Sequence, residues 1–167
     1  TMIKFFQRVW LEQDPRNKDY LAAAELVEKK KFSEAYEAYQ AIKSFRDSAD
    51  KMDEITGAYD TDFEEASQLI EEKDFYAAQK ILVKLPKRYG KALSESSIAK
   101  LKEFKKDTEA RNDIKLRPHL GKLVSKYKRK KMTKKGLIEY LNKIISKTPE
   151  TKTADLAQQI IDKLEEQ

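Results

Sequence analysis

Apolar residues recur three and four positions apart along most of the chain, with charged residues between them. This spacing places the apolar side chains on one face of an α-helix and predicts an all-α fold. The first such face is made of Met2, Phe5, Phe6, Val9 and Trp10. It predicts an N-terminal amphipathic helix within residues 1–16, which ends at Pro15 because the residue before a proline disfavours the helical conformation.

An internal repeat follows, with an offset of 43 residues between its two copies. YLAAAELVEKKKFSEAYEAYQAI starts at Tyr20, and FEEASQLIEEKDFYAAQKILVKL starts at Phe63. The identical pairs are Ala23 and Ala66, Leu26 and Leu69, Glu28 and Glu71, Lys30 and Lys73, Phe32 and Phe75, and Ala35 and Ala78. Because most of these pairs fall at apolar positions that face inward, we interpret each copy as a helical hairpin.

If each copy is a helical hairpin, its helix bounds, its helix cap and its core residues can be predicted. The first helix should span about residues 19–30 in one copy and 62–72 in the other. An aromatic residue follows the turn, and Ser33 is placed to cap the second helix of the first copy. We expect four aromatic side chains in the core: Phe32, Tyr39, Phe63 and Phe75.

Each copy resembles the tetratricopeptide (TPR) repeat family. In the first copy the matching residues are Ala23, Leu26, Phe32, Ala35 and Tyr39, and the resemblance covers about residues 18–100. The chain departs from the family in its offset of 43 residues rather than about 34. It also has lysine in place of the glycine common before the turn, and its first copy lacks the customary closing proline.

The TPR resemblance implies that the hairpins stack and that their first helices line a groove for a peptide or a partner helix. The groove residues it implies are Asn17, Tyr20, Ala24, Val27 and Glu28 in the first copy, and Phe63, Ser67, Ile70 and Glu71 in the second. It therefore implies a non-enzymatic interaction or scaffold protein that binds a protein partner.

Further helices are expected between and after the repeats. Ala49, Met52 and Ile55 predict a short additional helix, which would give each copy three helices. Pro86 and Gly90 should interrupt the second copy, and a longer helix should then run over about residues 94–112.

The last part of the chain predicts three amphipathic helices, which would form a small bundle or continue the repeat stack. Their apolar faces are Leu116, Leu120, Leu123, Val124 and Tyr127; Leu137, Ile138, Leu141, Ile144 and Ile145; and Leu156, Ile160, Ile161 and Leu164. Pro118 should lie in a first helical turn, Thr133 should cap the second helix, and the loop around Pro149 should end it. The predicted regions are thus an N-terminal helix (1–16), a repeat region (17–113) and a basic helical segment (114–167).

Charge is distributed unevenly over these regions. The chain carries a net charge of +6, and residues 114–167 alone hold 14 Lys or Arg against six Asp or Glu. Clustered cations without intervening acids are typical of a surface that contacts phosphates. The residues expected to bind phosphate or another anion are Lys122, Lys126, Lys128, Arg129, Lys130, Lys131, Lys134 and Lys135.

Three interpretations of this basic segment remain open from the sequence. It is a solvated face or an intramolecular partner of the more acidic repeats, a surface for nucleic acid, or a surface for an anionic membrane or an acidic protein. Lysine outnumbers arginine and only Tyr127 is interleaved, which favours diffuse phosphate contact over base recognition or stacking. Largely sequence-independent nucleic-acid binding is therefore the alternative to protein binding through the repeats.

Little in the sequence indicates catalysis. The chain has no cysteine and a single histidine, His119, so cysteine-based sites and most histidine metal sites are excluded. Asp60 to Glu71 places acids as a calcium loop does, but Glu65 stands where that loop needs glycine. The sequence contains no Gly-rich phosphate loop and no apolar run of membrane-spanning length, and we expect no signal peptide. We therefore expect no enzyme activity, cofactor, metal or small-molecule substrate, and a cytoplasmic location.

Overall fold

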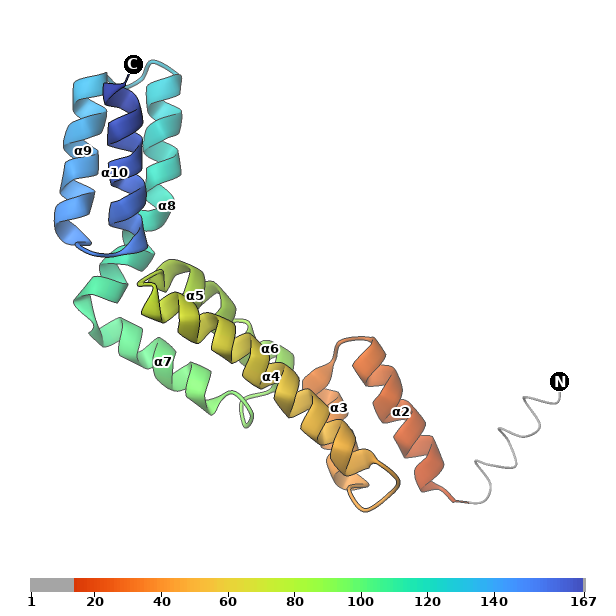
Figure 1. The fold of residues 1–167 in the computed structure, drawn as a ribbon. Helices are drawn as coiled ribbons and strands as arrows, with labels where there is room; N and C mark the ends of the chain where they lie inside the picture. The colour runs from red at the N-terminus through yellow and green to blue at the C-terminus, as the bar shows by residue number, and fades with distance from the viewer. Residues whose placement is uncertain (1–13, 167) are drawn as a thin grey trace. The chain divides into compact units, whose positions relative to one another are not determined.

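The computed structural model describes residues 14–166, and every regular element in that range is an α-helix (Figure 1). The all-α prediction is therefore confirmed for this part of the chain. The predicted apolar face from Met2 to Trp10 lies outside the described residues. The helices are α2 (Arg16–Glu28), α3 (Phe32–Ala41), α4 (Ser48–Glu71), α5 (Phe75–Leu82), α6 (Leu85–Tyr89), α7 (Glu95–Lys106), α8 (Thr108–Lys128), α9 (Lys134–Lys147) and α10 (Lys152–Glu165).

The chain divides into two compact units. In the described range, the first unit comprises residues 14–62 and 84–95, and the second comprises residues 63–83 and 96–166. Helix α4 contributes residues to both units. Helix α8 continues without a break past residue 113, where the sequence suggests a boundary. The units therefore follow a different division from the predicted regions 17–113 and 114–167.

The internal repeat reappears as two matching turns. Lys30 follows the end of α2 with φ 58°, and Lys73 follows the end of α4 with φ 55°. Each turn has two backbone hydrogen bonds: Lys30 N to Val27 O (2.9 Å) and Lys31 N to Leu26 O (2.9 Å), and Lys73 N to Ile70 O (3.0 Å) and Asp74 N to Leu69 O (2.8 Å). This is the Schellman arrangement, in which glycine usually takes the left-handed position. Lysine adopts that conformation in both copies.

The repeated small residues have equivalent places in the core. Ala23, Ala35, Ala66 and Ala78 have no exposed surface. Of the four aromatic residues expected in the core, Tyr39 and Phe75 are buried, whereas Phe32 and Phe63 are half-buried. The ring of Phe32 stacks on the ring of Tyr89 in α6, with 5.4 Å between the ring centroids. A helix that comes later in the chain therefore covers part of the Phe32 ring.

Several predicted helix boundaries are wrong. Ser33 lies inside α3, which begins at Phe32 without a side-chain cap. The expected short helix near residues 49–55 and the following repeat helix form one element, α4, because no proline separates them. The expected helix over residues 94–112 breaks at Asp107, whose carboxylate caps α8. Pro118 consequently lies in the interior of α8, where it removes the backbone donor that would reach the carbonyl of Ile114.

The predicted interruption at Pro86 and Gly90 is confirmed. Pro86 lies in the first turn of α6, where its missing N–H is tolerated. Gly90 ends α6 with φ 84° and lies directly against α3: a Cβ atom there would be 2.5 Å from Oγ of Ser33. Tyr89 is buried beside this turn, and its hydroxyl donates to Asp62 at 2.7 Å. Both its burial and this bond raise the pKa of Tyr89.

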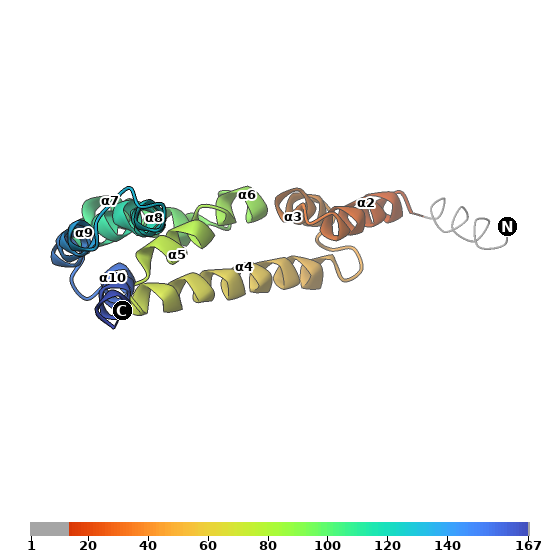
Figure 2. The ribbon, with the colours of Figure 1, turned by 90° about the horizontal axis from the view of Figure 1, so that it is seen from above.

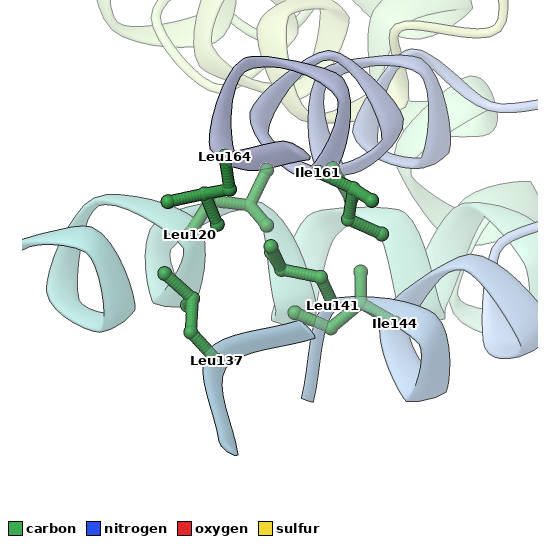
Figure 3. Packing of buried hydrophobic residues seen from close by; sticks show 7 residues of the cluster. Leu120, Leu137, Leu141, Ile144, Ile161 and Leu164 are labelled. Atoms are coloured by element: carbon green, nitrogen blue, oxygen red, sulfur yellow. The ribbon is translucent and has the colours of Figure 1, made fainter. Parts of the chain in front are cut away.

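The last three helices form a bundle within the second unit. Helices α8, α9 and α10 lie beside one another in both ribbon views (Figures 1 and 2). Buried residues from all three helices point toward a common centre in Figure 3: Leu120, Leu137, Leu141, Ile144, Ile161 and Leu164. Ala157 belongs to the same buried cluster. Thr133 caps α9 by accepting from Gly136 N at 3.1 Å, as expected. Of the two arrangements considered from the sequence, the chain forms the bundle.

Candidate anion-binding surface

The expected cations gather where α8 passes into α9. We call Lys126, Lys128, Arg129, Lys130, Lys131, Lys134 and Lys135 the basic tip. All seven are exposed, as is Lys122 one helical turn before Lys126. None of these eight side chains forms an ion pair with any residue in the range 14–166. Acidic residues of the repeats therefore do not pair with these eight cations in the described part of the chain.

A third Schellman turn brings these cations together. Lys130 takes φ 55° after the end of α8. Its N–H donates to Tyr127 O at 2.8 Å, and the N–H of Lys131 donates to Lys126 O at 2.9 Å. Thr133 then starts α9. Because the chain reverses within a few residues, cations from the end of one helix lie close in space to those from the start of the next.

Helix electrostatics account for only part of this charge. Lys126 and Lys128 lie in the last turn of α8, where the helix dipole favours a positive charge. Lys134 and Lys135 lie in the first turn of α9, which contains no acid, and there the dipole opposes a positive charge. Glu165 and Glu166, near the end of α10 at the same end of the bundle (Figure 1), form no ion pair with the tip. The local fold therefore does not require all of these cations.

Side chains of the bundle line three hollows. One, of about 670 Å³, lies at the tip itself and is lined by Tyr127, Lys128, Lys130, Lys131, Met132, Thr133 and Lys134. A second, of about 520 Å³, lies between α8 and α10 and includes Arg117, Lys128 and Lys163. A third, of about 370 Å³, lies between α8 and α9. No Asp or Glu lines any of these three hollows, so each presents only neutral or basic side chains to a ligand.

The residues expected in a repeat groove are distributed differently. On α2, Asn17 is buried, so the expected exposure of this residue is wrong. Ala24 and Val27 are half-buried and Glu28 is exposed. Tyr20 is half-buried, and its hydroxyl donates to Asp47 at 2.6 Å. That hydrogen bond is the main reason why the pKa of Tyr20 rises to about 12.

The second expected groove set lies on α4, in the other compact unit. Phe63, Ser67 and Ile70 are half-buried, and Ser67 donates its hydroxyl to Phe63 O at 3.0 Å. Glu71 is exposed. Glu28 and Glu71 are therefore the two members of the expected groove that are exposed in the described chain.

A buried polar junction in the second unit is a feature that sequence reasoning missed. Asp113 on α8 has no exposed surface. One carboxylate oxygen accepts from Tyr76 N at 2.9 Å, in the first turn of α5, and the other accepts from Thr153 N at 3.3 Å, in the first turn of α10. Both helix N-termini present unpaired N–H groups and a positive dipole, which offset the cost of burying the carboxylate. One side chain thus caps two helices distant in sequence.

Asp74 and Arg117 extend this junction. Asp74 caps α5 by accepting from Ala77 N at 3.1 Å, and its other oxygen accepts from Arg117 at 3.3 Å. Nearby, Lys73 contacts Glu150 at 2.5 Å, and this bond lowers the pKa of the Glu150 carboxyl. A signal for the junction is present in the sequence: Asp113 occupies an apolar-face position relative to Leu116 and Leu120, three and seven residues later.

The junction connects α5, α8 and α10. Its two carboxylates, Asp113 and Asp74, accept hydrogen bonds from backbone N–H groups at helix N-termini, and Asp74 also accepts one from Arg117. Across residues 14–166 no group of three or more His, Asp or Glu side chains is placed to hold a metal ion. None of the helices in the same range is long and apolar enough to cross a bilayer. The candidate site is the exposed basic surface, whose eight cations have no ion-pair partner in residues 14–166.

Comparisons with known proteins do not place the chain in a family. No family model, no curated protein and no solved structure matches it.

Proposed function

We propose that this chain is a non-enzymatic binding protein whose basic tip contacts the phosphate backbone of nucleic acid without reading its sequence. The observation that carries the proposal is the α8–α9 reversal. It collects seven exposed cations within ten consecutive residues, and none of them has an ion-pair partner in the described chain. Lysines that neutralise phosphates release condensed counterions, which supplies affinity for any sequence.

The composition of the tip favours a duplex over single strands. Six of the seven cations are lysines, which contact phosphates as point charges rather than through the bidentate geometry used for guanine. Tyr127 packs against the bundle core, is half-buried and is the one aromatic residue within residues 126–135, so the tip has no series of rings on which successive bases could stack. A continuous phosphate backbone matches this arrangement of charges better than unpaired bases do.

Protein binding through TPR-like hairpins is a second candidate. The matching turns at Lys30 and Lys73 support it, because they show one local structure used twice. Its exposed residues are Glu28 and Glu71, which suit a basic partner. The basic tip is the better supported site because its cations are all exposed, whereas Asn17 and Tyr20 of the expected groove are held within the first unit.

A mobility-shift titration with a duplex of mixed sequence tests the first proposal. If about five lysines contact phosphates, affinity should fall about 500-fold between about 50 and about 200 mM salt. The variant Lys128→Glu/Lys131→Glu/Lys134→Glu should reduce the magnitude of the salt slope by about three. These side chains are exposed and unpaired, so the variant should keep its helical circular dichroism.

A matched control removes the same charge elsewhere. Lys18, Lys43 and Lys84 are exposed lysines of the first unit without ion pairs in residues 14–166. Lys18→Glu/Lys43→Glu/Lys84→Glu should leave most of the affinity in place. The proposal fails if the unmodified chain gives no shift at about 50 mM salt, or if both triple variants lose affinity equally.

A further inference from the structure

The groove between α8 and α9 combines an apolar floor with basic edges. Its floor is made of Leu116, Leu123, Met132, Tyr140 and Ile144. Most of these side chains belong to the bundle core or pack on it, so the floor is held in place by the fold. Tyr140 is different, because 52% of its surface is exposed. It is a large apolar surface that the bundle leaves uncovered.

The basic side chains beside this floor come from both helices. His119 and Lys126 belong to α8, whereas Lys143 and Lys147 belong to α9. No acidic residue lines the groove, and none of the three lysines forms an ion pair within residues 14–166. The Lys143 ammonium lies 5.5 Å from the Tyr140 ring centroid, which places a cation at the edge of the exposed apolar surface. A complementary ligand is apolar in the middle and acidic along both sides.

The dimensions of the groove suit a helix. Leu116 and Lys126 are ten residues apart on α8, a distance of about 15 Å along the axis at about 1.5 Å per residue. A partner helix of about three turns has the same length, and its apolar residues at i, i+3, i+4 and i+7 would lie along the floor. A small amphiphilic anion carries its charge at one end, so it would leave the cations of one edge unpaired.

We propose that the α8/α9 groove binds an acidic amphipathic helix of a partner protein. The apolar stripe of that helix covers Tyr140, and its Asp and Glu residues pair with Lys126 on one side, where His119 can donate a hydrogen bond, and with Lys143 and Lys147 on the other. This interaction is separate from phosphate binding at the basic tip, although Lys126 belongs to both surfaces. It gives the chain a surface for a protein partner that does not depend on the repeat hairpins.

A designed peptide tests the proposal on the full chain. The peptide has leucines at i, i+3, i+4 and i+7 with glutamates beside them, and carries a fluorescent label for anisotropy titration. Two control peptides are a scrambled sequence of the same composition and a version with lysine in place of glutamate. The first peptide should bind at least about tenfold more tightly than either control, because only it combines the apolar stripe with acidic edges.

Substitutions on α9 test whether the designed peptide binds in the α8/α9 groove. Lys143→Glu/Lys147→Glu reverses one edge of the groove and should weaken peptide binding about tenfold. Lys134→Glu/Lys135→Glu makes the same charge change on the same helix but outside the groove lining, and should alter affinity less than about threefold. Tyr140→Ser removes exposed apolar surface and should also weaken binding, with unchanged thermal unfolding.

Several results would overturn the proposal. The proposal fails if the aligned and scrambled peptides bind with equal affinity. It also fails if Lys143→Glu/Lys147→Glu and Lys134→Glu/Lys135→Glu lose the same amount of peptide affinity. A third is the absence of peptide binding together with binding to phosphatidylserine vesicles that Lys143→Glu/Lys147→Glu abolishes, which would assign the groove to a membrane surface. Duplex binding that needs Lys143 and Lys147, without peptide binding, would instead assign these lysines to the phosphate-binding surface.

Discussion

Asp113→Ala is expected to destabilise the second unit by about 3 kcal/mol, since it removes two charge-assisted hydrogen bonds worth about 1.5 kcal/mol each. The bonds run from Tyr76 N at 2.9 Å and from Thr153 N at 3.3 Å. Because Asp113 is fully buried, the alanine variant leaves both N–H groups without a partner or easy access to water. The α5 and α10 N-termini should each lose one of their two side-chain acceptors, because Asp74 still caps α5 and Thr151 still caps α10.

Asp107→Ala provides a matched comparison. Asp107 also accepts two backbone bonds at a helix N-terminus, from Glu109 N at 2.8 Å and from Ala110 N at 3.3 Å. Asp107 is exposed, so water can replace its carboxylate, and losing this cap should cost about 1 kcal/mol. Asp113→Ala and Asp107→Ala therefore each remove two hydrogen bonds, and they differ mainly in whether the aspartate is buried or exposed.

Urea unfolding followed by circular dichroism at equal protein concentration measures both variants. Asp113→Ala should unfold at clearly lower urea than Asp107→Ala, with a difference of about 2 kcal/mol in the free energy of unfolding. Asp113→Asn should fall between them, because the amide keeps one acceptor but directs a donor at the second N–H. If Asp113→Ala costs no more than Asp107→Ala, the double-capping explanation of the junction is refuted.

Two further predictions concern the first unit. Lys30→Gly should stabilise the chain by about 1 kcal/mol in urea unfolding, because Lys30 has φ 58° and glycine occupies that region without the steric cost of a Cβ; a loss of stability would contradict this reading of the turn. The raised pKa of Tyr20 predicts that its contribution to stability is complete below about pH 10 and is lost as the pH rises toward about 12. In an ultraviolet titration, Tyr20→Phe should remove one phenol that ionises at about pH 12. If the variant instead loses a phenol that ionises near the ordinary tyrosine pKa of about 10, the hydrogen bond to Asp47 is absent in solution.

The sequence by itself determined the features that depend on local periodicity. The spacing of apolar residues predicted the helical class, the three helices of the bundle and the positions of Leu120, Leu141 and Ile161 in its core. It also identified the repeat, because identical residues at a fixed offset produce the same turn at Lys30 and at Lys73. The cations of the basic tip could be predicted as exposed, since charged residues rarely occupy a core.

Only the tertiary structure decided the features that depend on contacts distant in sequence. The sequence places Asp113 on the helix face of Leu116 and Leu120, but its two partners are found only where α5 and α10 bring their N-termini to it. Asn17 looks exposed until the first unit packs over it. The α8/α9 groove exists because the bundle buries Leu137 and Leu141 and leaves Tyr140 outside. Periodicity specifies which face of a helix is apolar, but packing decides which part of that face stays open to a partner.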